Sequence, residues 1–416
     1  MNSDKLNSEV PKRVLMIAQS FYDYDARILR QVETLKKNNI KVEIICLNYE
    51  NKPAHEKVNG VLVHRIMNKF DQNKILSYIF NSVIFLIKAL LLSRQLNKRN
   101  KFDIVQIHNM PDYLVFSALY LKLKGVYIIL DIHDLTIELF REKWGEIKFK
   151  LLKPLLLIGE RLSVLFADEL ITVSNECKQV LEKRNPGKNI SVIMNTPDLN
   201  YFPFNNKNYS EPNDKINLIY HGTIAERYGI HNLIYTINEL VKINKNVYLT
   251  IIGNIHTEYG SKLKTLVEKL GLNHNIIFEN SIPYRYVSER LKLADFGLVL
   301  PEVSDYTHYG IPTKVFEYAA IGLPQIVSKL SSIQSVFRNE SICLVNPHDY
   351  DFISKKIIEI YLNTEFRKRM AQCAFEDLQK VSFEIMQQKY LNIYESIFDK
   401  NSMRKKFVEQ GETYVQ

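Results

Sequence analysis

The chain has 416 residues, of which 46% are hydrophobic, and carries a formal net charge of +9. Because this length exceeds one ordinary hydrophobic core, it favours two domains. The basic charge permits nucleic acid, an anionic membrane or a phosphorylated substrate as partner. The widely separated Cys46, Cys177, Cys343 and Cys373 exclude a CxxC metal pair and a compact disulfide framework, and they fit a reducing compartment.

The N-terminal sequence MNSDKLNSEVPKR lacks the apolar core of a signal peptide, so we expect a cytoplasmic protein. After it, short apolar runs alternate with amphipathic stretches of helical length. Nearly continuous apolar runs of this kind predict a parallel sheet covered by helices on both faces. The runs expected as strands are 13–19, 42–48, 61–66, 103–109, 126–134, 169–174 and 190–195.

A helix is predicted directly after the first strand. Asp25 has the position of an N-cap, and Ile28, Leu29 and Val32 begin an apolar face that continues to Leu35. Arg27 lies in the first turn of this helix. We expect it at the rim of a ligand cleft, with a solvated surface arginine as the alternative.

The stretch 75–92, ILSYIFNSVIFLIKALLL, has the length of a bilayer span. Ser77, Asn81, Lys88 and Gln95 recur at spacings of four, seven and seven residues, which makes one polar stripe on a helix. A striped helix favours a core helix of the first domain, or one in the membrane interface, over a span. A second basic and apolar segment, KFKLLKPLLL at 148–157, suggests contact with anionic lipid, and a buried helix with solvated ends is its alternative.

Polar residues follow two of the predicted strands of the first domain. His133 and Asp134 end one strand, and His108 and Asn109 end the strand before it. The carboxyl ends of parallel strands are where ligands bind in open α/β sheets. A histidine there can hydrogen-bond a sugar hydroxyl, or it can simply satisfy the strand terminus.

The composition of the sequence changes after residue 196. Residues 197–214 are rich in Pro, Asn and Asp without a helical period, which is the composition of a linker. A second series of apolar runs follows and predicts a second doubly wound sheet. Its expected strands are 216–222, 247–254, 276–280, 296–301, 324–328 and 342–346.

The sequence YHGTIAERYGI at 220–230 joins a predicted strand to a predicted helix. Gly222 lets backbone amides approach a ligand closely, and Arg227 can carry positive charge to a diphosphate. A glycine loop between strand and helix is also an ordinary connection, so the loop alone is a weak signal.

The strongest signal is the segment YGIPTKVFEYAAIGLP at 309–324, predicted as a loop and a short helix between two strands. Pro312 suits a first helical turn, and Gly322 suits a helix end. Lys314 and Glu317, three residues apart, share one helix face. Lys314 can therefore face a phosphate while Glu317 accepts hydrogen bonds from ribose hydroxyls; a surface ion pair is the alternative.

This segment resembles the nucleotide-sugar-binding segment of the family 4 retaining glycosyltransferases, which have the GT-B fold. Glu317 matches the second glutamate of the family's E-x7-E pattern, and Tyr309 stands at the first. The P-x-K-x-x-E form of Pro312, Lys314 and Glu317 resembles that of polysaccharide-assembly branches. The loop after 216–222 resembles the family's G-R-x4-K-G loop, with Thr223 and Tyr228 at its basic positions.

The resemblance also assigns roles to residues elsewhere. It implies that Ile282 lays its backbone against the nucleobase and that Gly222, Thr223, Arg227, Lys314 and Glu317 bind the nucleotide sugar. The strand end DIHD resembles the family's D-x-H, which implies catalytic roles for His133 and Asp134. Contacts to donor or acceptor are expected from Arg27, in a D-x-R similar to that of the same branches, and from His108, Asn109 and Tyr309.

The resemblance implies an α/β protein of the GT-B class, with two doubly wound Rossmann-like domains facing each other across a cleft. We expect an N-terminal acceptor-side domain at 1–196, a linker at 197–214 and a nucleotide-sugar-binding domain at 215–382. The helical period of 383–398 predicts a last helix, 383–400, followed by a loose tail at 401–416, and the resemblance implies that this helix crosses back to the first domain.

The sequence therefore predicts a retaining glycosyltransferase that moves a sugar from a nucleoside diphosphate sugar to a lipid-linked or saccharide acceptor in surface polysaccharide synthesis. Arg227 and Lys314 can supply the positive charge that a metal would supply at the diphosphate, so no metal or other cofactor is expected, and the enzyme is expected at the inner face of the membrane as a peripheral protein. A catalytically silent partner subunit and a nonhydrolysing sugar-nucleotide epimerase are the alternatives. A nucleic-acid binder is not expected, because the sequence shows neither a basic stripe with aromatic partners nor a recognition module.

Overall fold

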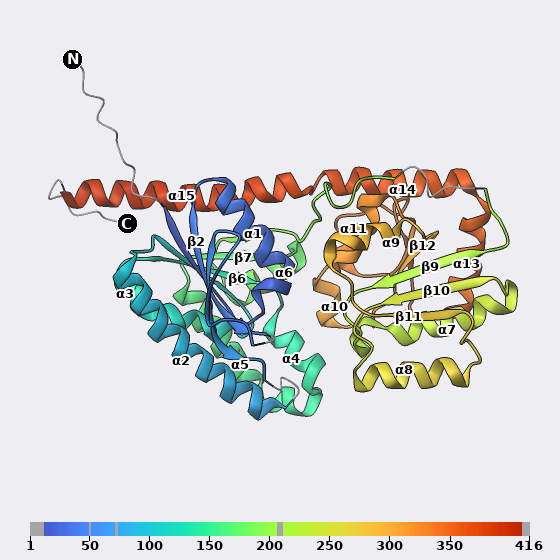
Figure 1. Cartoon of the computed structure of the whole chain (residues 1–416), viewed down its shortest axis with the longest axis horizontal. Coiled ribbons are helices and arrows are strands. Elements are labelled where there is room, and N and C mark those ends of the chain that lie inside the picture. Colours follow the sequence, from blue (N-terminus) through green and yellow to red (C-terminus); the bar gives the residue numbers. More distant parts are fainter. Residues whose placement is uncertain (1–11, 50, 71–73, 206–210, 410–416) are drawn as a thin grey trace, which may run out of the picture. The chain divides into compact units, whose positions relative to one another are not determined.

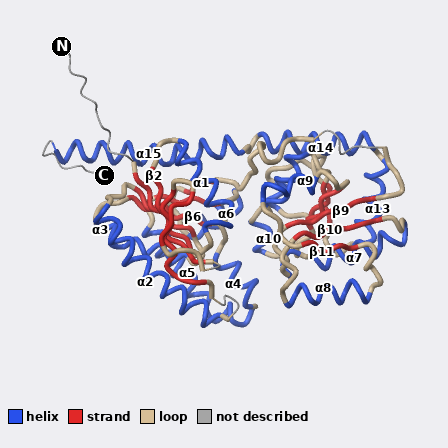
Figure 2. Tube along the Cα trace, viewed as in Figure 1, coloured by secondary structure: helices blue, strands red, loops and turns tan. Residues whose placement is uncertain are grey.

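The computed structural model describes residues 12–49, 51–70, 74–205 and 211–409, which form two compact units (Figure 1). Unit 1 comprises Met1–Val173, Cys177–Ile193 and Gln387–Gln416, and unit 2 comprises Ser174–Glu176 and Met194–Met386. Residues 1–11, on which most of the cytoplasmic expectation rests, lie outside the described residues. Figure 2 shows the strands of each unit gathered between helices.

Unit 1 contains an eight-stranded sheet in the order β3-β4-β2-β1-β5-β6-β7-β8. The strands pair in parallel, except that β3 runs antiparallel to β4. Strand β3 was not predicted, because its side chains are almost all exposed and give no hydrophobic signal. The strands are β1 (Arg13–Ala18), β2 (Lys41–Asn48), β3 (His55–Val58), β4 (Val61–Asn68), β5 (Ile104–His108), β6 (Tyr127–Ile132), β7 (Glu169–Thr172) and β8 (Ile190–Val192).

The helices of unit 1 connect these strands and cover the sheet. As predicted, the side chain of Asp25 caps the first helix by accepting a hydrogen bond from the Ile28 backbone N–H. The helices are η1 (Tyr22–Tyr24), α1 (Ala26–Lys37), α2 (Ile75–Arg99), η2 (Asp112–Ala118), α3 (Leu119–Leu123), α4 (Thr136–Trp144), α5 (Glu146–Phe166), α6 (Asn175–Arg184) and α15 (Phe383–Glu409).

Helix α2 is the one described helix that is long and apolar enough to cross a membrane by length and composition. It connects β4 to β5, two strands of one parallel sheet, so it lies along that sheet as a crossover. The predicted polar stripe does not mark its outer side. Ser77 and Asn81 are half-buried, whereas several large apolar residues are exposed.

Unit 2 contains a six-stranded parallel sheet in the order β11-β10-β9-β12-β13-β14. Its strands are β9 (Ile216–His221), β10 (Val247–Ile252), β11 (Ile276–Glu279), β12 (Phe296–Val299), β13 (Gln325–Ser328) and β14 (Cys343–Val345). Its helices are η3 (Glu226–Tyr228), α7 (Ile230–Ile243), α8 (Glu258–Lys269), η4 (Tyr284–Tyr286), α9 (Val287–Leu291), α10 (Asp305–Tyr309), α11 (Thr313–Ile321), α12 (Ser331–Gln334), α13 (Tyr350–Leu362) and α14 (Thr364–Gln379). Apolar residues of the strands and of α7 and α13 form its core.

The segment predicted as a linker is partly packed onto unit 2. Phe202 is fully buried and its ring lies 5.0 Å from that of Tyr284, while the Asn205 N–H donates to the Ile321 carbonyl. Apolar Phe side chains among the Pro and Asn residues explain this packing. Residues 206–210 lie outside the described residues.

Helix α15 begins at Phe383 in unit 2 and belongs to unit 1 from Gln387 onward. Its Tyr390 and Tyr394 hydroxyls both donate to the side-chain oxygen of Gln106 on β5, at 2.7 and 2.6 Å. The helix continues to Glu409, so the loose tail that we predicted from residue 401 is wrong for 401–409. That stretch contains no Gly or Pro to end a helix, and residues 410–416 lie outside the described part of the chain.

Candidate functional site

The first candidate site lies in unit 2, at the point of the sheet where the strand order changes direction. Strands β10 and β11 lie on one side of β9, and strands β12, β13 and β14 lie on its other side. Ligands of open α/β sheets bind at such a switch point, beyond the carboxyl ends of the strands. His221 ends β9 and is followed by Gly222, and α11 follows β12, so the two predicted motifs meet here.

Helix α11 has the predicted ends, with Pro312 at its N-cap and Gly322 in the left-handed conformation at its C-cap. Lys314 lies in its first turn and Glu317 one turn later, and their exposed fractions are 7% and 4%. The alternative of a surface ion pair is therefore wrong. Two charged side chains buried on one helix need partners or a function, because burial of an unpaired charge is costly.

Lys314 carries a buried ammonium group. Its ammonium lies 4.9 Å from the ring centroid of Tyr220 and 5.3 Å from that of Tyr228, so two aromatic faces line it. Among the described residues, no carboxylate forms an ion pair with it. Burial lowers the pKa of the Lys314 ammonium to about 8, although the more distant charge of Glu317 acts in the opposite direction.

Glu317 points toward His221. Its Oε2 lies 3.0 Å from the His221 Nε2, but the two atoms are not aligned for a hydrogen bond and neither makes another one. Both side chains are nearly buried, at 4% and 9% exposure. The carboxylate and the imidazole therefore keep hydrogen-bonding capacity for a ligand with several hydroxyl groups.

The loop after β9 is shaped around Lys314. Gly222 has a φ of +119°, which favours glycine, and a Cβ there would lie 3.5 Å from the Lys314 Nζ. The Tyr220 hydroxyl donates to the Thr223 carbonyl at 2.7 Å and holds the loop in place. The Arg227 guanidinium stacks 4.8 Å from the Tyr228 ring, so Arg227 and Lys314 both contact the same tyrosine.

Two predicted contacts of unit 2 lie further along the chain. Ile282 is half-buried in the loop between β11 and η4. Tyr309 ends α10 and its carbonyl accepts a hydrogen bond of 2.5 Å from the Ser174 hydroxyl. Contacts of these two side chains with a ligand are not tested by the structure, so their roles stay predictions.

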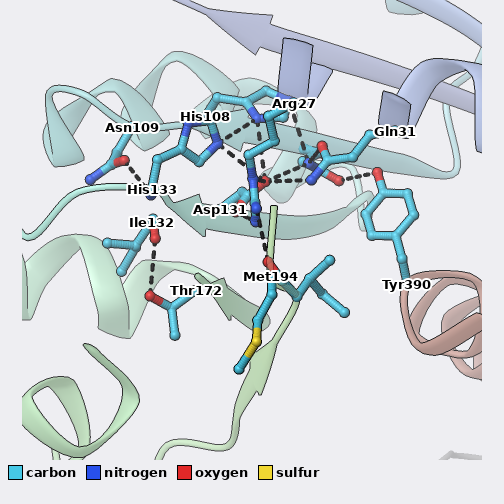
Figure 3. A network of polar contacts seen from close by, with 12 residues as sticks. Arg27, Gln31, His108, Asn109, Asp131, Ile132, His133, Thr172, Met194 and Tyr390 are labelled. Carbon is cyan, nitrogen blue, oxygen red and sulfur yellow. Dashed lines mark hydrogen bonds and ion pairs between the residues drawn. The ribbon is translucent and has the colours of Figure 1, made fainter. Parts of the chain in front are cut away.

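The second candidate site lies in unit 1 and follows from strand register. His108 on β5 pairs with Asp131 on β6, and side chains of paired residues in a parallel sheet point to the same face. Gln106 precedes His108 by two residues, and His133 follows Asp131 by two residues. All four side chains therefore lie on one face of the sheet, as Figure 3 shows for the two histidines and the aspartate.

Asp131 is the centre of this cluster (Figure 3). Its carboxylate accepts hydrogen bonds from the Arg27 guanidinium at 2.6 and 3.0 Å and from the Gln31 amide at 2.8 Å. His108 Nδ1 and His133 Nε2 lie 3.4 and 3.2 Å from it. Although burial alone would raise it, the charges of Arg27 and His133 hold the pKa of the Asp131 carboxyl well below its usual range.

Arg27 is thus buried in a bidentate ion pair, and our expectation that it points to an exposed rim is wrong. Its third donor, NH1, bonds to the Ile193 carbonyl at 2.9 Å. A sequence pattern cannot distinguish a rim arginine from a buried one, because the counter-ion Asp131 is distant in sequence. The direct interactions of Arg27 are with protein groups, and a direct contact with a ligand stays untested.

His133 is the member of the cluster that reaches solvent, with 18% of its side chain exposed. His108 is buried and lies 3.1 Å from it, and burial lowers the pKa of the His108 imidazole. Asn109 donates to the Asp134 carbonyl and accepts from the His133 N–H, so it fixes the strand end. The structure brings His108, Asn109, His133 and Asp134 together, as the strand ends predicted.

Four residues of these sites were given no role in the sequence analysis. Asp131 is the first residue of the DIHD strand end, and a carboxylate within a buried strand is unusual enough to have indicated a partner. His221 directly precedes the glycine that was singled out. Tyr228 was noted where the resemblance expects a basic residue, and Tyr220 gave no signal, because tyrosines are common in cores.

His108, Asp131 and His133 offer ligand atoms within 4.8 Å of one another, so the cluster was tested as a metal centre. The Arg27 guanidinium already bonds both oxygens of Asp131. A divalent cation would have to lie beside this fixed positive charge, which disfavours its binding. The donor set does not fit a metal ion.

Comparisons with known proteins agree with this architecture. Residues 26–201 match the family model described as Glycosyltransferase Family 4, and residues 202–377 match the model described as Glycosyl transferases group 1. The capsular polysaccharide biosynthesis glycosyltransferase CapH of Staphylococcus aureus is 25% identical over 241 residues. That match covers 56% of this chain and 61% of the relative, which is less than two thirds of its length.

Solved structures match over nearly the whole chain. Sucrose-phosphate synthase from Thermosynechococcus elongatus superimposes with a TM-score of 0.76 at 16% identity, over 94% of this chain and all of that chain (100%). HepE of Anabaena, solved with UDP and glucose, superimposes with a TM-score of 0.68 at 13% identity, over 92% of this chain and 100% of that one. The two units therefore have the Rossmann-like domains of the GT-B fold, as predicted.

Proposed function

Because glycosyltransferase family models match both halves of the chain, we propose that it is a retaining glycosyltransferase of family 4. In this proposal it transfers a sugar from a nucleoside diphosphate sugar to a lipid-linked or saccharide acceptor in surface polysaccharide synthesis. The observation that carries the proposal is the buried Lys314 ammonium beside the Gly222 loop, which forms no ion pair with a carboxylate in the described part of the chain. A diphosphate is the anion that such a cation lacks.

Lys314 and Arg227 have the charge needed to stabilise the departing diphosphate. When the bond between the anomeric carbon and the diphosphate breaks, negative charge grows on the phosphate oxygens. Cations fixed in a largely water-excluded site stabilise that charge more than they would in water. Lys314 also lies in the first turn of α11, whose N-terminal N–H groups add positive potential.

Glu317 and His221 are assigned to the ribose of the donor. Their facing polar atoms, Oε2 and Nε2, are 3.0 Å apart and lack other hydrogen bonds. A pair of ribose hydroxyls can donate to the carboxylate and exchange a hydrogen bond with the imidazole. The structure of HepE with UDP and glucose shows that a protein of this fold can bind such a nucleotide, which supports the assignment.

His133 is assigned to a sugar hydroxyl, with Asp131 as the residue that positions it. The imidazole is partly exposed on one side and faces the Asp131 carboxylate at 3.2 Å on the other. A carboxylate behind a histidine fixes its tautomer and its orientation. Asp134, which we predicted as catalytic, keeps that role as a proposal.

In a retaining transfer, the acceptor oxygen forms its bond to the anomeric carbon on the face that the diphosphate leaves. The acceptor hydroxyl proton then passes to the departing phosphate oxygen, so atoms and charge balance without a metal. We propose that Lys314 and Arg227 replace the metal at the diphosphate. CapH is a capsular polysaccharide glycosyltransferase, and this relative supports an acceptor from surface polysaccharide assembly.

The test is a thermal-shift titration of the purified protein with a panel of nucleotide sugars and free nucleoside diphosphates. A saturable increase in melting temperature with one nucleotide series supports the donor site, and no shift with any member of the panel contradicts it. Product analysis by mass spectrometry then separates the alternatives. A silent subunit binds without turnover, whereas an epimerase converts the nucleotide sugar to its epimer without glycosyl transfer to an acceptor.

A further inference from the structure

Helix α2 of unit 1 buries a narrow side and exposes a row of large apolar side chains. Its positions with 0% exposure are Ser82, Phe85, Ala89 and Ser93. A helix on the surface of a soluble domain normally exposes polar and charged residues instead. The exposed apolar residues form one stripe along the helix: Leu76 (79%), Ile79 (42%), Phe80 (67%), Val83 (42%), Ile87 (51%) and Leu91 (58%).

Helix α5 shows a second stripe of the same kind. Its exposed apolar residues recur every three or four positions, which places them on one side of the helix. They are Ile147 (87%), Leu151 (80%), Leu155 (65%), Ile158 (56%), Leu162 (52%) and Leu165 (58%). Two long apolar stripes on one unit exceed what scattered surface hydrophobic residues explain.

The two helices belong to one side of unit 1. Both pack against η2, and the α2 residue Ile75 joins the small core that the α5 residue Phe149 forms with Phe140. Figure 1 shows α2 on the side of the unit 1 sheet opposite to α15. The two helices therefore belong to the same helical layer of unit 1. We call their two exposed apolar stripes together the α2–α5 face.

The charges around the α2–α5 face are almost all positive. Helix α2 contains no Asp or Glu, and in α5 Glu160 is buried against Arg184 and Asn185, which leaves Glu146 as its exposed carboxylate. The exposed basic residues of the two helices are Lys88, Arg94, Lys98, Arg99, Lys148, Lys150, Lys153 and Arg161. Apolar side chains surrounded by Lys and Arg match a surface that is apolar inside and anionic at its boundary.

We propose that the α2–α5 face docks the protein onto an anionic lipid bilayer, with its apolar stripes in the headgroup boundary and its basic residues at lipid phosphates. A second copy of the chain fits less well, because pairing two such faces would bring like charges together. A transmembrane α2 is excluded, since β4 and β5 at its two ends belong to one sheet. The proposal goes beyond the donor chemistry and does not depend on it.

The mode of docking has a measurable signature. Each lysine at an anionic surface strengthens binding about fivefold, and salt screens this contribution. Each buried leucine strengthens binding about tenfold or more, and salt does not weaken it. Binding is therefore expected to need anionic lipid, to weaken at high salt and to persist in part through the apolar stripes.

The experiment is cosedimentation of the full chain with vesicles of phosphatidylglycerol and phosphatidylcholine, and with vesicles of phosphatidylcholine alone, at low and high salt. Two variants test the two contributions. One replaces Leu76, Leu151 and Leu155 with serine, and the other replaces Lys148, Lys150 and Lys153 with glutamate. Both variants are expected to lose at least a hundredfold in affinity while keeping the wild-type circular dichroism spectrum and the wild-type response to nucleotide.

Matched controls replace equally exposed residues of unit 2. Leu293 and Leu362 to serine test general loss of surface leucines, and Lys262, Lys355 and Lys368 to glutamate test general loss of charge; both controls are expected to bind as wild type. Wild-type protein that ignores anionic vesicles overturns the proposal, as do stripe variants that bind like wild type. A lipid-free dimer in analytical ultracentrifugation that the leucine variant abolishes also overturns it, since the face then binds a second copy.

Discussion

Replacing Lys314 with methionine is expected to stabilise the fold and to abolish nucleotide binding at the same time. Methionine has similar length and no charge, so it fills the space between Tyr220 and Tyr228 without the cost of a buried ammonium. The pKa of Lys314 falls from the usual 10.5 to about 8 in the folded protein. At 1.36 kcal/mol for each pKa unit, the buried charge costs about 3 kcal/mol.

The pH dependence of the free energy of unfolding tests whether this cost comes from the Lys314 charge. Folded Lys314 loses its proton near pH 8 and unfolded Lys314 near pH 10.5, so unfolding between these values takes up a proton. Wild-type stability from this group therefore rises with pH across that window. The advantage of Lys314→Met is about 3 kcal/mol at pH 7 and decreases to about 1 kcal/mol at pH 9.5.

Equilibrium urea unfolding followed by far-UV circular dichroism at the two pH values measures the difference. The single tryptophan, Trp144, lies in unit 1, so its fluorescence separates the unfolding of unit 1 from that of unit 2. Lys262→Met on the surface of α8 is the matched control and should change neither stability nor nucleotide affinity by a measurable amount. A less stable Lys314→Met at pH 7, or one that keeps nucleotide affinity, would refute the interpretation of Lys314 as a cation held for a ligand.

Three further outcomes are expected. Glu317→Ala weakens nucleoside diphosphate binding by about 1.5 to 3 kcal/mol in isothermal titration calorimetry, the loss of a hydrogen bond to a charged group, and unchanged affinity would contradict the ribose assignment. Sugar transfer survives EDTA, whereas activity that vanishes and returns with magnesium or manganese would show that a metal assists the leaving group. Asp131→Asn lowers the free energy of unfolding by about 3 to 5 kcal/mol, because it leaves the Arg27 charge unpaired in the interior, and a melting temperature equal to wild type would contradict the buried ion pair.

The fold class could be predicted from the sequence because the strands of a parallel sheet are buried on both faces and therefore appear as nearly continuous apolar runs. Runs such as 13–19 and 216–222 are nearly continuously apolar, and the structure has a strand within each of them. The edge strand His55–Val58 was not predicted, because its side chains are exposed and show no alternation of buried and exposed positions. Hydrophobic periodicity reports burial, so a strand whose side chains are exposed gives no such signal.

The sites were predicted unevenly for a related reason. Lys314, Glu317 and Gly222 lie in local motifs of strand, loop and helix, and local spacing places them correctly. Arg27 pairs with Asp131 across 104 positions, and no local pattern contains that contact. The choice between a core and an interfacial α2 stayed open, because a polar stripe indicates one face of a helix without saying which face is covered.

Two of the buried charges, those of Asp131 and Lys314, differ in a way that separates structure from function. Asp131 is surrounded by Arg27, Gln31 and two imidazoles, and the pKa of its carboxyl lies below its usual range, so the fold stabilises its charge. Lys314 has two tyrosine faces and no ion-paired carboxylate among the described residues, and the fold destabilises its charge. A protein gains nothing for its own stability from such a lysine. The missing counter-ion is therefore best explained as a ligand, and the negative charge that fits beside a glycine loop and a helix N-terminus is a phosphate.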